Sequence, residues 1–160
     1  MTTRTAQTEI MADPDVPLVR ITREFDAPPE KVFRAHTDPA LYAQWVGPRG
    51  FDAQIEHYDC RTGGSYRYIH TNAAGESYGF HGCFHEVRSP ETIVQTFTFE
   101  GYPDGVALER LVLEPLPGGR TRLTATSLVD SFEARDAVLA SGMETGIREG
   151  YERLDALVAG

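Results

Sequence analysis

The strongest constraint on the fold is a run of six segments with the composition of β-strands, each separated from the next by a turn signal. The connections are too short to contain a crossover helix, so consecutive segments have to pair as antiparallel neighbours. Glycine, proline and asparagine mark these connections. We therefore predict an antiparallel meander. Its strands are expected at about residues 51–60, 64–71, 77–87, 92–100, 107–115 and 121–129.

The segment before this meander predicts one more strand and two short helices. Residues 18–26 alternate apolar and polar side chains, which is typical of a half-buried strand. Pro29 then opens a short helix, because the first helical turn does not need the amide donor that proline lacks. Asp38 is a candidate N-cap for the second helix, which Gly47 and Pro48 end.

The C-terminal segment, residues 133–158, changes to a helical period. Its apolar residues recur at intervals of three and four, which places them on one face of a long helix. Three glycines follow at four-residue steps, although each costs up to about 1 kcal/mol in a helix interior. They either allow close packing on the sheet or leave room for a ligand. The apolar residues are Leu139, Met143, Ile147, Tyr151, Leu154 and Val158, and the glycines are Gly142, Gly146 and Gly150.

Charge and composition argue against several classes of partner. With a net charge of -9 and a pI near 5.0, the chain lacks the clustered lysine and arginine that bind nucleic acid or an anionic membrane. We expect no membrane insertion and no secretory signal. The sequence favours a cytoplasmic protein with a flexible lead-in at residues 1–16 and a single domain at 17–160. Cys60 and Cys83 are expected to be free thiols, and a homodimer is left open.

Five stretches of the sequence, taken in order, resemble the activator of heat-shock protein 90 ATPase homologue-like family, a branch of the START and birch-pollen-allergen superfamily. The resemblance covers about residues 18–158. It is carried by ITREFDAPPEKVFRAHTDPALYAQWVGP from Ile21, DCRTGG at 59–64, GFHGCFHEVRSPETIVQTF at 79–97, EPLPGGRTRLTAT at 114–126 and GMETGIREGYERLDAL at 142–157.

This resemblance implies an α+β helix-grip fold. A curved seven-stranded antiparallel sheet would wrap around the long C-terminal helix and enclose a cavity, with two short helices after the first strand. Members of the superfamily bind, carry or transform many unrelated apolar molecules, so the fold alone does not define an activity. We expect a small apolar or aromatic ligand between sheet and helix, and no cofactor.

Several strand and helix residues are candidates for lining this cavity. Tyr66, Tyr68 and His70 share one face of their strand, because side chains alternate along a strand. Aromatic walls with a few polar groups are typical of small-molecule sites, whereas tyrosines packed in a closed core are the alternative. The other candidates are Trp45, Gln95, Phe97, Phe99, Glu109, Leu111, Met143, Gly146 and Ile147.

Glu109 is the titratable residue of greatest interest in this set. On an inward face with Leu111 it would be a buried carboxylate, which is costly unless it is paired or protonated. A strand end or a bulge would instead turn it to solvent, and one bulge reverses every inward assignment beyond it. Trp45 either closes the cavity mouth or packs the short helices onto the sheet.

No catalytic motif or metal site is recognisable in the sequence. It contains no nucleophile elbow, phosphate-binding loop or dinucleotide motif. His81 and His85 would lie about 13 Å apart along one strand, too far to share an ion. His70 and Glu109 are the candidates for acid–base catalysis. The remaining histidines are His36 and His57.

Three functions stay open at this point. The first is binding or carriage of a small hydrophobic or aromatic molecule. The second is an enzyme of the cyclase or dehydratase type, polyketide-cyclase-like, with His70 and Glu109 as general acid and base and Tyr66 or Tyr68 stabilising an enolate. The third is a co-chaperone-like role in the stress response. Family members that act in this way usually carry an additional N-terminal domain, which residues 1–16 cannot form.

Overall fold

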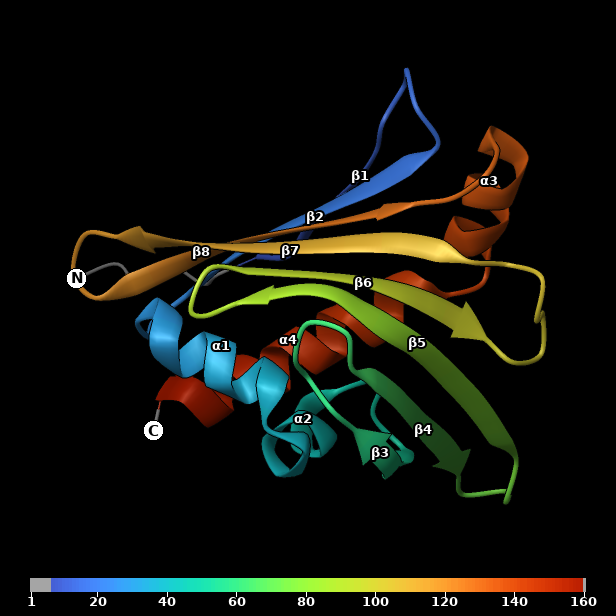
Figure 1. Ribbon diagram of the computed structural model, residues 1–160, viewed down its shortest axis with the longest axis horizontal. Helices are drawn as coiled ribbons and strands as arrows, with labels where there is room; N and C mark the ends of the chain where they lie inside the picture. The colour runs from blue at the N-terminus through green and yellow to red at the C-terminus, as the bar shows by residue number, and fades with distance from the viewer. Residues whose placement is uncertain (1–6, 160) are drawn as a thin grey trace.

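The computed structural model describes residues 7–159, which form one antiparallel sheet and four helices. Two strands and two helices come first, six strands follow, and two helices end the chain (Figure 1). In chain order the elements are β1 (Glu9–Ala12), β2 (Leu18–Phe25), α1 (Pro29–Thr37), α2 (Pro39–Trp45), β3 (Phe51–Tyr58), β4 (Ser65–Asn72), β5 (Ser77–Arg88), β6 (Thr92–Phe99), β7 (Ala107–Leu116), β8 (Arg120–Leu128), α3 (Phe132–Ala140) and α4 (Met143–Ala159).

The strands form one sheet in the order β1-β2-β8-β7-β6-β5-β4-β3. Strands β3 to β8 pair consecutively and antiparallel, which confirms the predicted meander. β2 joins the sheet by pairing with β8 along its whole length, from Leu18↔Leu128 to Phe25↔Thr121. The sheet curves around α4 (Figure 1). The α+β helix-grip arrangement is therefore confirmed.

The sheet has one strand more than the seven that we expected. β1 lies inside the predicted flexible lead-in and pairs with β2 from Glu9↔Thr22 to Ala12↔Val19. Only Ile10 of this strand packs against the core. A strand of four residues with a single core-facing side chain has no alternation of apolar and polar residues, so it could not be recognised in the sequence. Residues 1–6 of the expected lead-in lie outside the described part of the chain.

Proline and aspartate define the two short helices, as the sequence predicts. Pro29 is the first residue of α1, and Asp38 caps α2 by accepting a hydrogen bond from the amide of Ala40 at 2.9 Å. The indole N–H of Trp45 then donates to the carbonyl of Ala35 at 2.9 Å. This bond fastens the end of α2 to α1, so the two helices pack as a unit.

The C-terminal helix is interrupted, whereas the sequence predicts one helix over residues 133–158. α3 ends at Ala140 and α4 begins at Met143, because Gly142 between them has a φ of +86°. This left-handed backbone suits glycine and ends a helix. Gly142 is therefore a terminator rather than part of a glycine stripe. Within residues 7–159, no helix has both the length and the apolar composition to cross a membrane.

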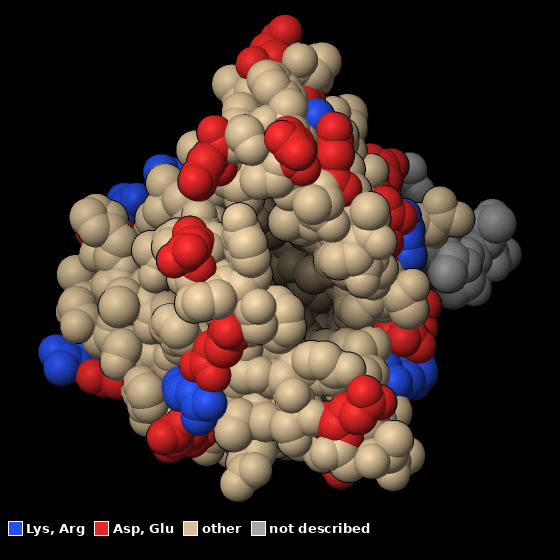
Figure 2. All heavy atoms as spheres, turned by 90° about the vertical axis from the view of Figure 1, so that its right-hand side faces the viewer, with Lys and Arg blue, Asp and Glu red and all other residues tan. Residues whose placement is uncertain are grey.

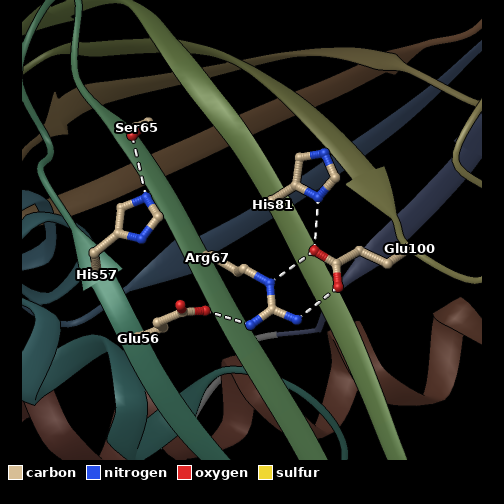
Figure 3. A network of polar contacts seen from close by, with 6 residues as sticks. All are labelled: Glu56, His57, Ser65, Arg67, His81 and Glu100. Carbon is tan, nitrogen blue, oxygen red and sulfur yellow. Dashed lines mark hydrogen bonds and ion pairs between the residues drawn. The ribbon is translucent and has the colours of Figure 1, made fainter.

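A network of charged side chains lies on the outer face of the sheet (Figure 3). Arg67 of β4 forms two hydrogen bonds of 2.8 Å with Glu100 and also pairs with Glu56. His81 of β5 contacts the same Glu100 carboxylate at 2.8 Å. The hydrogen bonds from Arg67 and then His81 lower the pKa of Glu100 to about 2. These side chains pair with one another on the side of β4 opposite to Tyr66 and Tyr68. They therefore link neighbouring strands on the solvent side of the sheet, outside the core.

Candidate functional site

Side-chain packing closes one end of the inner side of the sheet. At this end β6 and β8 begin, β2 and β7 end, and α1 and the last turns of α4 cover them. The facing side chains are buried and form one apolar cluster. They include Phe25, Val32, Phe33, Ile93, Leu113, Leu123, Tyr151, Leu154 and Val158. This end of the inner face is packed core.

Toward the other end, several inward side chains of β5, β6, β7 and β8 are only partly buried. They lie on strands with neighbours on both sides and they face α4, so their remaining accessible surface has to border unfilled space. Figure 2 shows a hollow on this side of the molecule, where in Figure 1 β6 ends and α4 begins. The partly buried residues are Phe80, Gln95, Phe97, Glu109, Leu111, Ala125 and Ser127 on the strands, and Met143 and Ile147 on α4.

Aromatic rings from β4, β5 and β6 form a continuous wall on the inner face, in which Tyr66 and Tyr68 are buried and Phe80 and Phe97 are partly exposed to the open space. Tyr66 stacks on Tyr68 with ring centroids 6.0 Å apart, Tyr68 stacks on Phe80 at 5.4 Å, and Phe80 stacks on Phe97 at 5.5 Å. From α2, Tyr42 meets Tyr68 edge-on at 5.8 Å, and the two hydroxyl groups share a hydrogen bond. Such mutual contacts hold each ring in place. The wall is therefore preformed.

A row of polar side chains runs beside this wall across three strands. Glu109 of β7 is the direct cross-strand partner of Gln95 on β6 and of Ser127 on β8. The Gln95 amide donates to Glu109 Oε1 at 3.3 Å and to the Tyr66 hydroxyl at 3.2 Å. The Ser127 side chain also bonds the Glu109 carboxylate, and Tyr66 donates to the carbonyl of Thr96 at 2.6 Å. One carboxyl group thus lies among neutral partners inside the cavity.

Burial raises the pKa of Glu109 to about 7, because desolvation disfavours the carboxylate and the hydrogen bonds from Ser127 and Gln95 offset only part of that cost. Desolvation also raises the pKa of the surrounding tyrosine hydroxyls, and the negative charge of Glu109 adds to the effect. Near neutral pH these tyrosines are uncharged, whereas Glu109 readily takes up or releases a proton. The tyrosines are Tyr42, Tyr66, Tyr68 and Tyr151.

His70 lies at the end of the aromatic wall rather than beside Glu109. Its ring is 5.1 Å from the ring of Tyr68 and 5.3 Å from that of Phe80, and its Nε2 atom is buried without a hydrogen-bond partner. Burial, and then the charge of Arg153, lower the pKa of His70 to about 4. The ring is therefore neutral near pH 7. The structure does not join His70 and Glu109 into the acid–base pair that the sequence suggested.

Most of the predicted lining residues lie on the inner face of the sheet or on α4. Tyr66, Tyr68 and His70 point inward from β4, so their predicted common face is correct. The structure turns Glu109 inward as well, and not toward solvent. Tyr66, Tyr68 and His70 are buried, whereas the partly buried residues of the predicted set are Gln95, Phe97, Glu109, Leu111, Met143 and Ile147.

Two predicted lining residues, Trp45 and Gly146, lie elsewhere. Trp45 is only 6% exposed and packs against Tyr151, so it holds the short helices in place and does not close a mouth. Phe99 instead lies on the inner face, where its ring is 5.4 Å from that of Phe80, and it is 38% exposed at the end of β6. A Cβ on Gly146 would lie 3.5 Å from Pro48 in the loop after α2. A Cβ on Gly150 would lie 3.0 Å from the carbonyl of Trp45, which supports the packing explanation for these glycines.

Three residues around Glu109 and the aromatic wall were not predicted from the sequence. Ser127 could have been found from the short hairpin around Gly118, whose register places it opposite Glu109. Tyr151 was predicted on the apolar face of the C-terminal helix, but not as a neighbour of Glu109. Tyr42 gave no signal, because a side chain on a short helix reaches Tyr68 only through the tertiary fold.

The curved sheet, the C-terminal helix against it and the space between them define a helix-grip protein. A family model described as "Activator of Hsp90 ATPase homolog 1-like protein" matches residues 26–159. The chain belongs to this family, which confirms the resemblance seen in the sequence.

Solved structures similar to this chain share the same fold over nearly its whole length. Protein Ms6760 from Mycobacterium smegmatis is 27% identical, with a TM-score of 0.85 over 96% of this chain and 97% of that one. A Rhodobacter sphaeroides protein is 31% identical, with a TM-score of 0.84 over 94% and 97%. An Arthrobacter aurescens protein is 29% identical, with a TM-score of 0.86 over 94% and 91%. No protein among those with curated functions matches the sequence.

Proposed function

We propose that this protein binds a small, largely apolar and aromatic molecule in the cavity between the sheet and α4. The observation that carries this proposal is the difference between the two ends of one inner face. Strands β6, β7 and β8 bear the buried side chains Ile93, Leu113 and Leu123 toward one end and partly buried inward side chains toward the other. A pocket of this kind, apolar with a few fixed polar groups, is what small-molecule sites require.

The polar row supports an oriented mode of binding. Stacked rings offer flat apolar surface to a ligand. Gln95, Glu109 and Ser127 lie at one level across the strands, so a ligand with one hydrogen-bonding group would be held with that group toward them. Because these side chains already bond one another, the site needs little ordering when a ligand enters.

The test is a titration with the neutral fluorescent probe N-phenyl-1-naphthylamine, together with native mass spectrometry of the purified protein. We expect saturable fluorescence enhancement, a one-to-one adduct and a raised melting temperature. Ala125→Phe fills the space from β8 and should weaken probe binding by about tenfold or more. Leu108→Phe adds a similar ring at an exposed position on β7 and should leave binding unchanged.

Near-ultraviolet circular dichroism checks that Ala125→Phe keeps its fold. The substitution Met143→Trp, at the start of α4, blocks the same space from the opposite side and provides a second independent variant. The proposal would be abandoned if the wild-type protein gave no adduct and no thermal shift, or if both filling variants bound the probe as well as Leu108→Phe does.

One observation favours a second function, a proton-transfer enzyme of the cyclase type. Glu109 has a pKa raised to about 7, which suits a general base near neutral pH, and Tyr66 lies one hydrogen bond beyond Gln95. The test is exchange of the acidic C–H proton of 2-acetyl-1-tetralone in deuterated water. Protein-catalysed exchange that Glu109→Gln abolishes would support this function, and exchange equal to that of buffer would exclude it for this class of compound.

A further inference from the structure

Glu109 is a partly buried acid without a cationic partner among the described residues. Its hydrogen bonds come from the Gln95 amide and the Ser127 hydroxyl, both neutral. A carboxylate taken out of water is costly unless a positive charge lies beside it. The cavity therefore contains an acidic group whose negative charge no described side chain neutralises.

Arg23, on the inner face of β2, and Arg153, on α4, have other partners. Arg23 donates to the carbonyl of Glu24 at 3.2 Å, lies 3.5 Å from Asp155 and sits over the ring of Phe25. Arg153 donates to the carbonyl of Gly47 in the loop after α2. Neither contributes to the pKa of Glu109.

No other group facing Glu109 supplies a positive charge. His70, at the end of the wall, is neutral because its pKa is lowered to about 4. The titratable groups that face Glu109 are phenols from three elements, kept neutral by raised pKa values. They are Tyr66 and Tyr68 on β4, Tyr42 on α2 and Tyr151 on α4.

The surroundings of this carboxylate suit a cation. Aromatic faces attract positive charge through their quadrupoles, more strongly where water is excluded. Acidic side chains stand on several sides of the hollow in Figure 2, and the chain carries a net charge of -9. A field of this sign raises the local concentration of cations and repels anions.

We propose that the ligand of this cavity is an aromatic or alicyclic amine, bound as its ammonium ion against Glu109 with its apolar body on the partly exposed rings of Phe80 and Phe97. This inference rests on the proposed binding function and specifies the charge of the ligand. The ammonium group donates to the carboxylate in addition to Gln95 and Ser127. An anionic analogue of the same shape is rejected, because it would place two negative charges together.

The experiment compares three probes of one shape: 2-naphthylmethylamine, 2-naphthylmethanol and 2-naphthoate. Isothermal titration calorimetry at pH 8 measures each with the wild-type protein, Glu109→Gln and Glu114→Gln. Glu114 is exposed on the same strand, so its variant changes the net charge equally without altering the cavity. We expect the amine to bind at least about tenfold more tightly than the alcohol, and the naphthoate not to bind.

Glu109→Gln should remove the preference for the amine, whereas Glu114→Gln should keep it. A second readout uses the wild-type protein alone. Between pH 8 and pH 5.5 the affinity for the amine should fall by about tenfold, because Glu109 takes up a proton while the amine stays charged. The affinity for the alcohol should not fall.

The outcomes separate this inference from the proposed function. If the alcohol binds as well as the amine, or if Glu109→Gln and Glu114→Gln behave alike, the cationic ligand is excluded while the cavity remains a binding site. Tight binding of the naphthoate overturns the inference in the same way. If none of the three probes binds the wild-type protein, the proposed binding function fails together with it.

Discussion

Gly79 on β5 lies directly beneath the carboxyl group of Glu100. A Cβ at Gly79 would overlap that carboxyl group, so the absence of a side chain lets Glu100 reach across β5 to Arg67 on β4 (Figure 3). The outer ion-pair network therefore depends on a glycine that takes no part in it. This accounts for a glycine in a strand, where it is otherwise unfavourable.

Gly79→Ala should break this network with little loss of stability. Glu100 can swing away from the new methyl group, and the ion pairs that it loses are partly exposed, so solvent screens them and they contribute little to stability. The expected change is in titration: the pKa of Glu100, lowered to about 2 in the wild-type protein, should rise toward its usual value. Carboxyl carbon NMR measures this. Cys83→Ala, at an exposed position of the same strand, is the control, and an unchanged Glu100 titration in Gly79→Ala would contradict the account.

Gly47→Ala should destabilise the protein far more than Gly50→Ala. Both glycines have a φ of +85°, so both variants lose roughly 1 kcal/mol from backbone strain. A Cβ at Gly47 would also overlap the buried ring of His70, whereas nothing lies within 4 Å of a Cβ at Gly50. We expect a total loss of about 2–4 kcal/mol for Gly47→Ala. Urea unfolding of both variants checks this, and equal losses would show that His70 yields freely.

The stability of the wild-type protein should fall relative to that of Glu109→Gln as pH rises from 5 to 8. The folded state raises the pKa of Glu109 from 4.5 to about 7, so in this window the unfolded carboxyl releases its proton before the folded one. The protonated Glu109 carboxyl group therefore stabilises the folded state fully below the unfolded pKa, and this contribution is lost as pH rises through the folded pKa. The difference should reach on the order of 2–3 kcal/mol at 1.36 kcal/mol per unit. Urea unfolding across this range measures it, and parallel curves for the two proteins would refute a raised pKa.

The two free cysteines should differ in reactivity. Cys83 is exposed, whereas Cys60 is half-buried, and burial followed by the charge of Asp59 raises its pKa to about 12. The thiolate is the nucleophile, so Cys60 should react with Ellman's reagent at pH 8 more slowly than Cys83, by a factor on the order of a hundred. Cys83→Ala should remove the fast phase and leave the slow one. Two thiols with equal rates would show that Cys60 is accessible.

The sequence predicted the parts of the fold that depend on local pattern. The two-residue period correctly placed Tyr66, Tyr68 and His70 on one face, and Asp38 was recognised as a cap. Because the register shifts lie between Ile55 and His57 and between Phe84 and Glu86, they did not disturb the face assignments on β4.

What the sequence did not predict depends on non-local contacts. Gln95 meets Glu109 across a long connection whose length does not fix a register. Trp45 is an aromatic residue of the kind that often lines a cavity, but its hydrogen bond to the carbonyl of Ala35 places it in the packed core. Gly142 fits a glycine stripe as well as it fits a terminator, and only its positive φ separates the two.

The two outermost strands of the sheet offer little backbone to another chain. β1, at one edge, is four residues long, and β3, at the other, is irregular between Ile55 and His57 and exposes Asp52 and Glu56. Short, bent or charged edges hinder edge-to-edge pairing of sheets. Fibril-like growth by strand addition is therefore disfavoured at both ends, and copies of this chain that associate would have to meet through side chains on another surface.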